Sequence, residues 1–283
     1  MNQKLIELMK IYDTLATCDL CEEFHKKSSK KTEYDGLINF FHTKEIYLNI
    51  PSIWTDWVNR IDSKIMIVGQ DWGPYIDMQS YSEKYKKLSS ILKSEEKAWR
   101  IIINEKESMT KSLMTEFILR SAANYNINLD ESIMDSFFVT NAVLCARKGN
   151  NYRGTENFSA KFCTENCSYA LSRQIETIKP LIVITLGYWP FYSICKNHNI
   201  FVHKTLKENI LHYGLNKENI LTIPIENQST YILPVYHPVA QVKKEEQISL
   251  YNIMWELLLQ HYSIDELKKE MNTYKYYRGE LNI

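Results

Sequence analysis

Four short runs of apolar residues, each bounded by residues that favour turns, recur along the chain. Three of them, 64–69, 136–143 and 181–186, predict buried β-strands. The fourth run, 231–235, contains Pro234, and it is placed at a sheet edge or a strand end because proline donates no hydrogen bond to a ladder. Patterns of helical period separate the runs, over about residues 80–103, 108–125, 160–178, 189–198 and 244–261.

Strands that alternate with helices predict an α/β fold, with a central, mostly parallel four-stranded sheet flanked by helices. Glycine (8 residues) and proline (7 residues) are scarce, and no linker composition divides the chain. We therefore expect one domain over residues 1–283: a helical extension (1–60), an α/β core (61–262) and a C-terminal tail (263–283). Ligands bind outside the carboxyl ends of such strands, so we expect the site in four segments: 69–75, 141–153, 187–190 and 236–241.

Composition narrows the class of protein. Hydrophobic residues make up 45% of the chain and charged residues 24%, as in an ordinary folded protein. No uncharged apolar run of about 18 residues predicts a membrane span. The N-terminus lacks the apolar centre of a signal peptide, so we expect a cytoplasmic location. The 34 basic and 34 acidic residues cancel, so a nucleic-acid site would require a local basic face.

The cysteines form the first pattern that carries chemistry. The chain has six, and Cys18 and Cys21 form a C-x2-C pair. Two thiolates at this spacing commonly ligate one metal ion or cluster. By spacing alone, zinc and a [4Fe–4S] cluster are equally suitable. Cys195 lies in an apolar helical pattern and is expected to be a small buried hydrophobe.

Three polar side chains stand in or just after the predicted strands. Asp71, in GQDWGPY, can orient a water and stabilise positive charge on a sugar, or it can close a turn. Asn141 lies in an otherwise apolar strand, where its amide can pair with backbone or with the edge of a base. His237 precedes Pro238 and can donate a hydrogen bond to a leaving group, or it can be a surface histidine. Each motif, taken alone, fits the structural interpretation at least as well.

The order and spacing of these motifs together resemble the uracil-DNA glycosylase superfamily, and most closely its iron–sulfur family, often called family 4. GQDWGP resembles the superfamily's water-activating turn after the first strand. VTNAVLC resembles the Thr-Asn-x-Val-x-Cys stretch of the iron–sulfur family. The segment from Cys167 to Gly187 is similar to that family's fourth cysteine, helix and strand, and HPVA is similar to its His-Pro-Ser or His-Pro-Ala-Ala loop.

The resemblance implies a DNA glycosylase that flips out a uracil or related pyrimidine, hydrolyses its N-glycosidic bond and leaves an abasic site, as in base-excision DNA repair. It implies that Asp71 and His237 are the catalytic residues, with Asp71 aiming a water and His237 bonding to the leaving base. It further implies that Asn141, Gln70 and Tyr75 bind the base. The iron–sulfur family usually has Glu where this chain has Gln70, so we expect the acid function to have shifted to Asp71.

The resemblance also implies a structural [4Fe–4S] cluster, with zinc as the alternative metal. The residues that match the family's ligands are Cys18, Cys21, Cys145 and Cys167. Cys163, one helical turn before Cys167, is the rival for the fourth place.

DNA, single- or double-stranded, is the expected partner of a monomeric protein. Val239 and Gln241 would enter the space that the flipped base leaves. Phosphate contacts are expected from basic residues, each of which is otherwise a solvated surface residue: Arg147, Lys148, Arg153 and Lys243.

Departures from the family pattern leave other functions open. The loops after GQDWGPY and after Cys145 are long, and the aromatic residue that stacks on the base has only the candidates Tyr75, Tyr81 and Tyr85. These features favour a bulky modified pyrimidine as substrate, such as modified cytosine of viral DNA in a defence role. The shift of the acid from position 70 to Asp71, with zero net charge, favours a catalytically inactive DNA-binding relative. A zinc-stabilised α/β protein of unrelated function is the third alternative.

Overall fold

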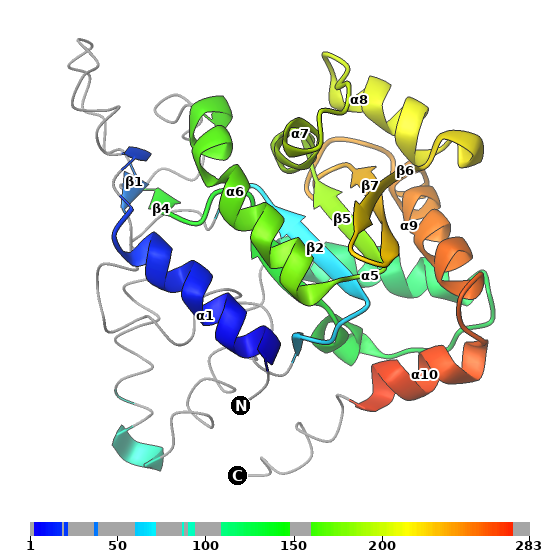
Figure 1. The fold of residues 1–283 in the computed structure, drawn as a ribbon. Coiled ribbons are helices and arrows are strands. Elements are labelled where there is room, and N and C mark those ends of the chain that lie inside the picture. The colour runs from blue at the N-terminus through cyan, green and yellow to red at the C-terminus, as the bar shows by residue number, and fades with distance from the viewer. Residues whose placement is uncertain are drawn as a thin grey trace.

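A five-stranded sheet forms the centre of the molecule (Figure 1). The structure is a computed structural model that describes residues 3–18, 20–21, 37–38, 60–71, 87, 90–93, 109–147 and 160–273. In sheet order the strands are β3 (Phe138–Asn141), β2 (Ile65–Gly69), β5 (Ile182–Leu186), β7 (Gln228–Val235) and β6 (Leu221–Ile225). The first four run parallel and β6 runs antiparallel to β7. The predicted α/β class with a mostly parallel sheet is confirmed.

The expected count of four strands is corrected to five, because β6 completes the sheet as an edge strand. Its sequence, LTIPI, alternates buried and exposed positions, and Pro224 is tolerated because an edge strand needs fewer ladder donors. Pro234 lies next to the last residue of β7, beyond the final pair with β6 at Ile232. Since β7 lies inside the sheet, the strand-end alternative for this proline is the correct one.

Helices cover both faces of the sheet, because the side chains of each strand alternate between two apolar layers. Met66 and Val68 of β2 pack with α1 (Gln3–Ala16), α6 (Ala160–Ile178) and α7 (Tyr188–Asn197). Ile65 and Ile67 pack on the opposite face with α5 (Met109–Ala123) and α9 (Lys244–Leu259). Figure 1 shows α1 and α6 on the near side of the sheet and α5 behind it.

The helices that the sequence predicts over 108–125, 160–178, 189–198 and 244–261 correspond to α5, α6, α7 and α9. Most of the predicted helix over 80–103 lies outside the described residues. Several short elements were not predicted: β1 (Leu37–Ile38), η3 (Glu131–Ser136), β4 (Ala146–Arg147), α8 (Leu206–Asn209), η4 (Ile210–Gly214), η5 (Lys217–Asn219) and α10 (Ile264–Thr273). β1 pairs with β4, and α10 buries Leu267 and Met271 in a stretch that was expected to be a tail.

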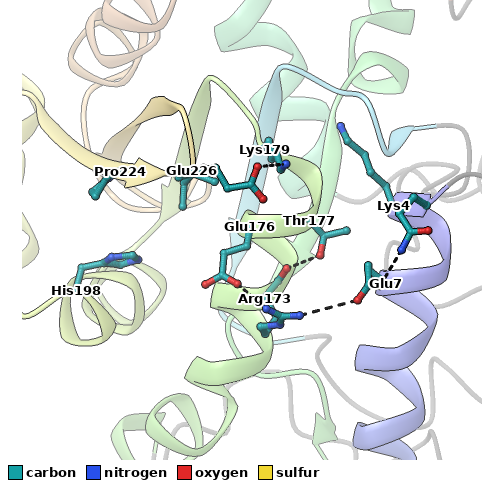
Figure 2. A pocket seen from close by; sticks show the side chains of 11 residues that line it. Lys4, Glu7, Arg173, Glu176, Thr177, Lys179, His198, Pro224 and Glu226 are labelled. Carbon is teal, nitrogen blue, oxygen red and sulfur yellow. Dashed lines mark hydrogen bonds and ion pairs between the residues drawn. The ribbon is translucent and has the colours of Figure 1, made fainter.

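A polar pocket lies at the amino end of the sheet, between α1, α6 and β6 (Figure 2). Lys4 Nζ donates to the carbonyl oxygens of Ile61 (3.2 Å) and Ile178 (2.9 Å). Arg173 pairs with Glu176 at 3.0 Å and reaches Glu7 of α1 at 3.9 Å. The charged groups that line this pocket bond to one another and to the ends of helical turns. These contacts connect the N-terminal helix α1 to the core.

No helix in the described part of the chain is long and apolar enough to cross a membrane.

Candidate active site at the carboxyl edge of the sheet

The predicted polar residues meet at the carboxyl edge of the sheet. β2 ends at Gly69 and leads to Asp71, β3 ends at Asn141, and β7 leads to His237. The register pairs Gly69 directly with Asn141. Three polar side chains that are far apart in the sequence thus stand at the same end of three parallel strands of one sheet, where open α/β sheets bind ligands.

Asn141 lies across the backbone of Gly69. A Cβ atom on Gly69 would stand 2.3 Å from the Asn141 Oδ1 atom, so only glycine leaves room for this amide. Asn141 is 7% exposed, and its amide makes no hydrogen bond to another described residue. A nearly buried amide normally finds partners, so this one is available to a bound ligand.

The position of Asn141 predicts the effect of Gly69→Ala. The new methyl group should displace the amide, lower base release and reduce the free energy of unfolding by about 1–3 kcal/mol, as overpacking does. Gly214→Ala is the matched control, because a Cβ atom there comes no closer than 3.4 Å to another heavy atom. Urea unfolding and base release would be measured for both variants. If Gly69→Ala behaves like Gly214→Ala in both measurements, the contact does not hold Asn141 in place.

Gln70 and Asp71 form a pair in the turn after β2. The Gln70 Nε2 group donates a hydrogen bond of 3.0 Å to the Asp71 Oδ2 atom. Both side chains are half-buried, so the amide orients the carboxylate while part of it stays accessible. Gln70 therefore supports Asp71 in this structure.

His237 lies close enough to Asp71 for the charge of the carboxylate to act on it. Burial lowers the pKa of His237, and the negative charge of Asp71 partly offsets this effect. The lowered pKa favours a neutral imidazole at pH 7, which carries one N–H donor. A neutral donor next to a carboxylate can stabilise negative charge on a leaving group without forming a fixed ion pair.

The loop that carries His237 is anchored on α9. The Gln247 Nε2 group donates to the Pro238 carbonyl oxygen at 3.3 Å, and the Ala240 N–H donates to the His237 carbonyl oxygen at 2.8 Å. Gln247 is 2% exposed, so this contact is part of the core. The contact with Gln247 thus fixes the backbone of the loop, while the side chain of Val239 is 45% exposed.

The carboxylate of Asp71 is expected to influence the pKa of His237. Asp71→Asn should lower the pKa of His237 further, because the carboxylate that raises it is removed. NMR titration of the histidine rings measures this shift. His198 is the internal reference: burial also lowers its pKa, but its charged neighbour is Glu176, so its titration should not move. An unchanged His237 pKa in Asp71→Asn would show that the two groups do not interact.

The lowered pKa of His237 also makes the free energy of unfolding depend on pH. A histidine with a lowered pKa in the folded state binds fewer protons than in the unfolded state. The contribution of His237 to stability is therefore present above the ordinary histidine pKa of about 6.5 and is lost as the pH falls below it.

Four cysteines gather around Val143, just after the end of β3. Cys21, Cys163 and Cys167 are buried around Val143, and Cys145 packs against them partly buried. They come from the segment after α1, the segment after β3 and the first turns of α6. Hydrogen bonding to Cys21, together with burial, raises the pKa of the Cys163 and Cys167 thiols. The structure thus brings together thiols from three distant segments.

The other two cysteines differ. Cys195 lies on the inner face of α7 and is fully buried in the core, which agrees with the expected role as a small hydrophobe, and burial raises its pKa to about 12. Cys18 is half-buried. Among the residues that the structure describes, no three His, Cys, Asp or Glu side chains stand in the geometry of a metal-ion site.

The remaining predicted site residues fall into three groups. Gln241 and Lys243 are exposed between the His237 loop and α9, at the same edge as Val239. Arg147 belongs to β4, and only its backbone is described. Tyr75, Tyr81, Tyr85, Lys148 and Arg153 lie outside the described residues. Sequence reasoning did not single out the aromatic residues Tyr188, Trp189 and Tyr192, although it placed function in the segment 187–190 that holds two of them.

Together, the fold and the site define an α/β protein with helices on both faces of its sheet and a polar ligand site at the carboxyl edge. The chain belongs to the uracil DNA glycosylase superfamily, whose family model matches residues 55–259. The match covers all five strands of the central sheet and the residues Asp71, Asn141 and His237. Members of this superfamily are DNA glycosylases, which are hydrolases that act on DNA in repair. No curated protein matches the chain.

Proposed function

We propose that the protein is a DNA glycosylase that hydrolyses the N-glycosidic bond of a flipped-out uracil or related pyrimidine and leaves an abasic site. The observation that carries this proposal is the convergence of Asp71, Asn141 and His237 at one sheet edge within the region that matches the superfamily. A duplex hides this bond, so the target nucleotide must leave the stack before it can react.

Asn141 selects the base. Its amide offers two donors and one acceptor, is nearly buried, and makes no hydrogen bond to another residue that the structure describes. A pyrimidine edge that matches these groups satisfies the amide, whereas a mismatched edge leaves buried polar groups unpaired and is rejected.

Bond cleavage separates charge, and the site has a group for each sign. The bond between C1′ and the base nitrogen breaks, and its electron pair leaves with the base. The Asp71 carboxylate stabilises the positive charge that grows on the sugar and directs a water to C1′, while the N–H of neutral His237 donates to the oxygen of the departing base. The water oxygen bonds to C1′ and its proton passes to the carboxylate or to solvent. Each aimed group is worth about 3–4 kcal/mol in comparable sites.

The cysteine group is proposed to hold a structural [4Fe–4S] cluster of the family 4 type. The ligands would be Cys18, Cys21, Cys145 and Cys167, with Cys163 as the rival for the last place and zinc as the alternative metal. Support comes from the gathering of Cys21, Cys145, Cys163 and Cys167, since buried thiols from three segments are the donors that such a cluster requires. When bound, the cluster would crosslink the segment after α1 to α6 and to the end of β3; hydrolysis needs no redox step.

DNA is proposed to lie along the carboxyl edge. The exposed Val239 side chain would fill the gap that the flipped nucleotide leaves, with Gln241 beside it. Lys243 would contact phosphate.

The test is base release from a panel of oligonucleotides that carry uracil, thymine, cytosine, 5-hydroxymethylcytosine or its glucosylated form, measured as alkali-sensitive cleavage by anaerobically purified protein. Release of uracil alone supports uracil excision. Release of a modified cytosine instead supports the bulky-pyrimidine alternative and a defence role. If iron-bearing protein binds these oligonucleotides and releases no base from any of them, the proposed activity is wrong and the protein is a DNA-binding relative.

A further inference from the structure

Three aromatic side chains gather on the first turns of α7, and the proposed mechanism uses none of them. The rings of Tyr188 and Tyr192 are stacked, with centroids 6.1 Å apart and planes inclined by 18°. The Trp189 ring stands edge-on to both, at 5.1 Å from Tyr188 and 5.6 Å from Tyr192. All three are half-buried. We call Tyr188, Trp189 and Tyr192 the α7 aromatic platform.

The platform begins between the two strands that carry the candidate catalytic residues. β5 lies between β2, which leads to Asp71, and β7, which leads to His237. Gly187, with a φ of 100°, turns the chain from β5 straight into α7, and its N–H donates to the Val235 carbonyl oxygen at 2.9 Å. Tyr188 is therefore the second residue after β5, on the edge that holds the proposed site.

The platform forms the outer face of α7, whose inner face is buried. Phe191, on the inner face of α7, is fully buried against the sheet. On the outer face, where polar residues are usual, aromatic rings remain partly accessible. Clustered, partly accessible tyrosine and tryptophan rings are typical of contact surfaces, so the platform is a candidate contact surface.

Polar contacts hold one end of the platform in place. The Tyr192 hydroxyl donates to the Glu165 carboxylate at 2.7 Å, and Lys196 Nζ pairs with the same carboxylate at 2.7 Å. In the described part of the chain, neither the Trp189 indole N–H nor the Tyr188 hydroxyl makes a hydrogen bond. Polar ends of aromatic residues usually find partners when they are covered, so these two groups are free for a ligand. A ring already fixed in place loses little freedom on binding.

We propose that the α7 aromatic platform stacks on unpaired nucleobases next to the excised nucleotide, so that single-stranded DNA is the preferred substrate. This inference rests on the proposed function for its choice of DNA as the ligand. Every base has a π-face that can stack on an aromatic ring, but in a duplex these faces are occupied by neighbouring base pairs. A strand that is already unpaired also avoids the cost of extruding the target from a duplex.

The test measures binding to a fluorescein-labelled oligothymidylate, which carries no uracil, and to the blunt duplex of the same sequence. Trp189→Ala should raise the Kd for the single strand by about 5- to 100-fold and change the Kd for the duplex by less than about threefold. Trp189→Phe keeps a ring, so its single-strand affinity should stay within about threefold of native. The chain has six tryptophans, so the quenching of tryptophan fluorescence by the oligonucleotide should decrease by the contribution of Trp189. This variant keeps the test valid if Trp189→Ala does not fold.

Tyr231→Ala is the matched control, because Tyr231 is a half-buried tyrosine of β7 that pairs with Ile182 at the start of β5, with its ring 6.0 Å from His261. It should leave both Kd values unchanged. Equal losses on single strand and duplex, or unchanged binding and quenching in both Trp189 variants, would overturn the inference, as would a native protein that binds only duplex. Base release is assayed separately, so platform-dependent binding without base release would contradict the proposed activity and leave the platform in place.

Discussion

Asp71→Asn is expected to reduce base release by about 10²- to 10³-fold without loss of the fold. The substitution removes the negative charge that would stabilise the developing positive charge on the sugar and accept the proton of the attacking water. Asparagine has the same shape, and its Oδ1 atom can still accept the 3.0 Å hydrogen bond from Gln70. The loss should therefore appear in the rate of the chemical step, measured in single-turnover assays, and not in DNA affinity or melting temperature.

A charge relocation serves as the control for this result. The double variant Gln70→Glu/Asp71→Asn moves the carboxylate one position earlier, to the place where the iron–sulfur family usually has Glu. Recovery of about tenfold or more over Asp71→Asn would show that a carboxylate in this turn is what the reaction needs. If Asp71→Asn alone releases base at the native rate, Asp71 is not catalytic and its role is confined to the turn.

Cys145→Ser is expected to give the second large effect, because Cys145 belongs to every ligand set considered. The native protein should carry about four iron and four sulfide per chain and absorb visible light, and the variant should lose both. Since metal-binding free energy is also folding free energy, the melting temperature should fall by on the order of 10 °C or more. Iron and sulfide analysis of anaerobically purified protein, with thermal unfolding, measures both effects.

The remaining cysteines supply controls and a choice between ligands. Cys195→Ser makes the same change in a buried cysteine outside the group, so it should keep the iron. Cys163→Ser and Cys167→Ser separate the two rivals, because only the true ligand should be required for full iron content. A colourless native protein that contains zinc would show that the cysteines bind the alternative metal and not a cluster. Full iron content in Cys145→Ser would refute the proposed ligand sets.

Much of the architecture can be predicted from local patterns in the sequence. The runs that became β2 and β5 are apolar on every residue because both faces of these strands are covered by helices, and this makes them visible in the sequence. Since parallel strands end at one edge, the positions of Asp71, Asn141 and His237 after three strands were enough to predict that they share a site. The family match over residues 55–259 includes all three of these residues.

Other features depend on contacts between distant segments, which a linear pattern does not contain. β6 became a strand because β7 offered it a partner, although Pro224 argues against a strand locally. Only the folded chain shows that Gly69 makes room for the Asn141 amide, that Gln70 orients Asp71, and that Cys163 lies among the buried thiols together with Cys167.

The α7 aromatic platform is another feature that depends on contacts between distant segments. In the sequence, YWPFY after a strand is equally consistent with four buried aromatic rings, and periodicity alone does not separate them. The packing of α7 on the sheet turns Phe191 inward and leaves Tyr188, Trp189 and Tyr192 on the outer face. The sequence by itself determined which segments carry the chemistry, because strand and helix periods are local properties. The tertiary structure decided which side chains meet and which face outward, because packing between distant segments sets both.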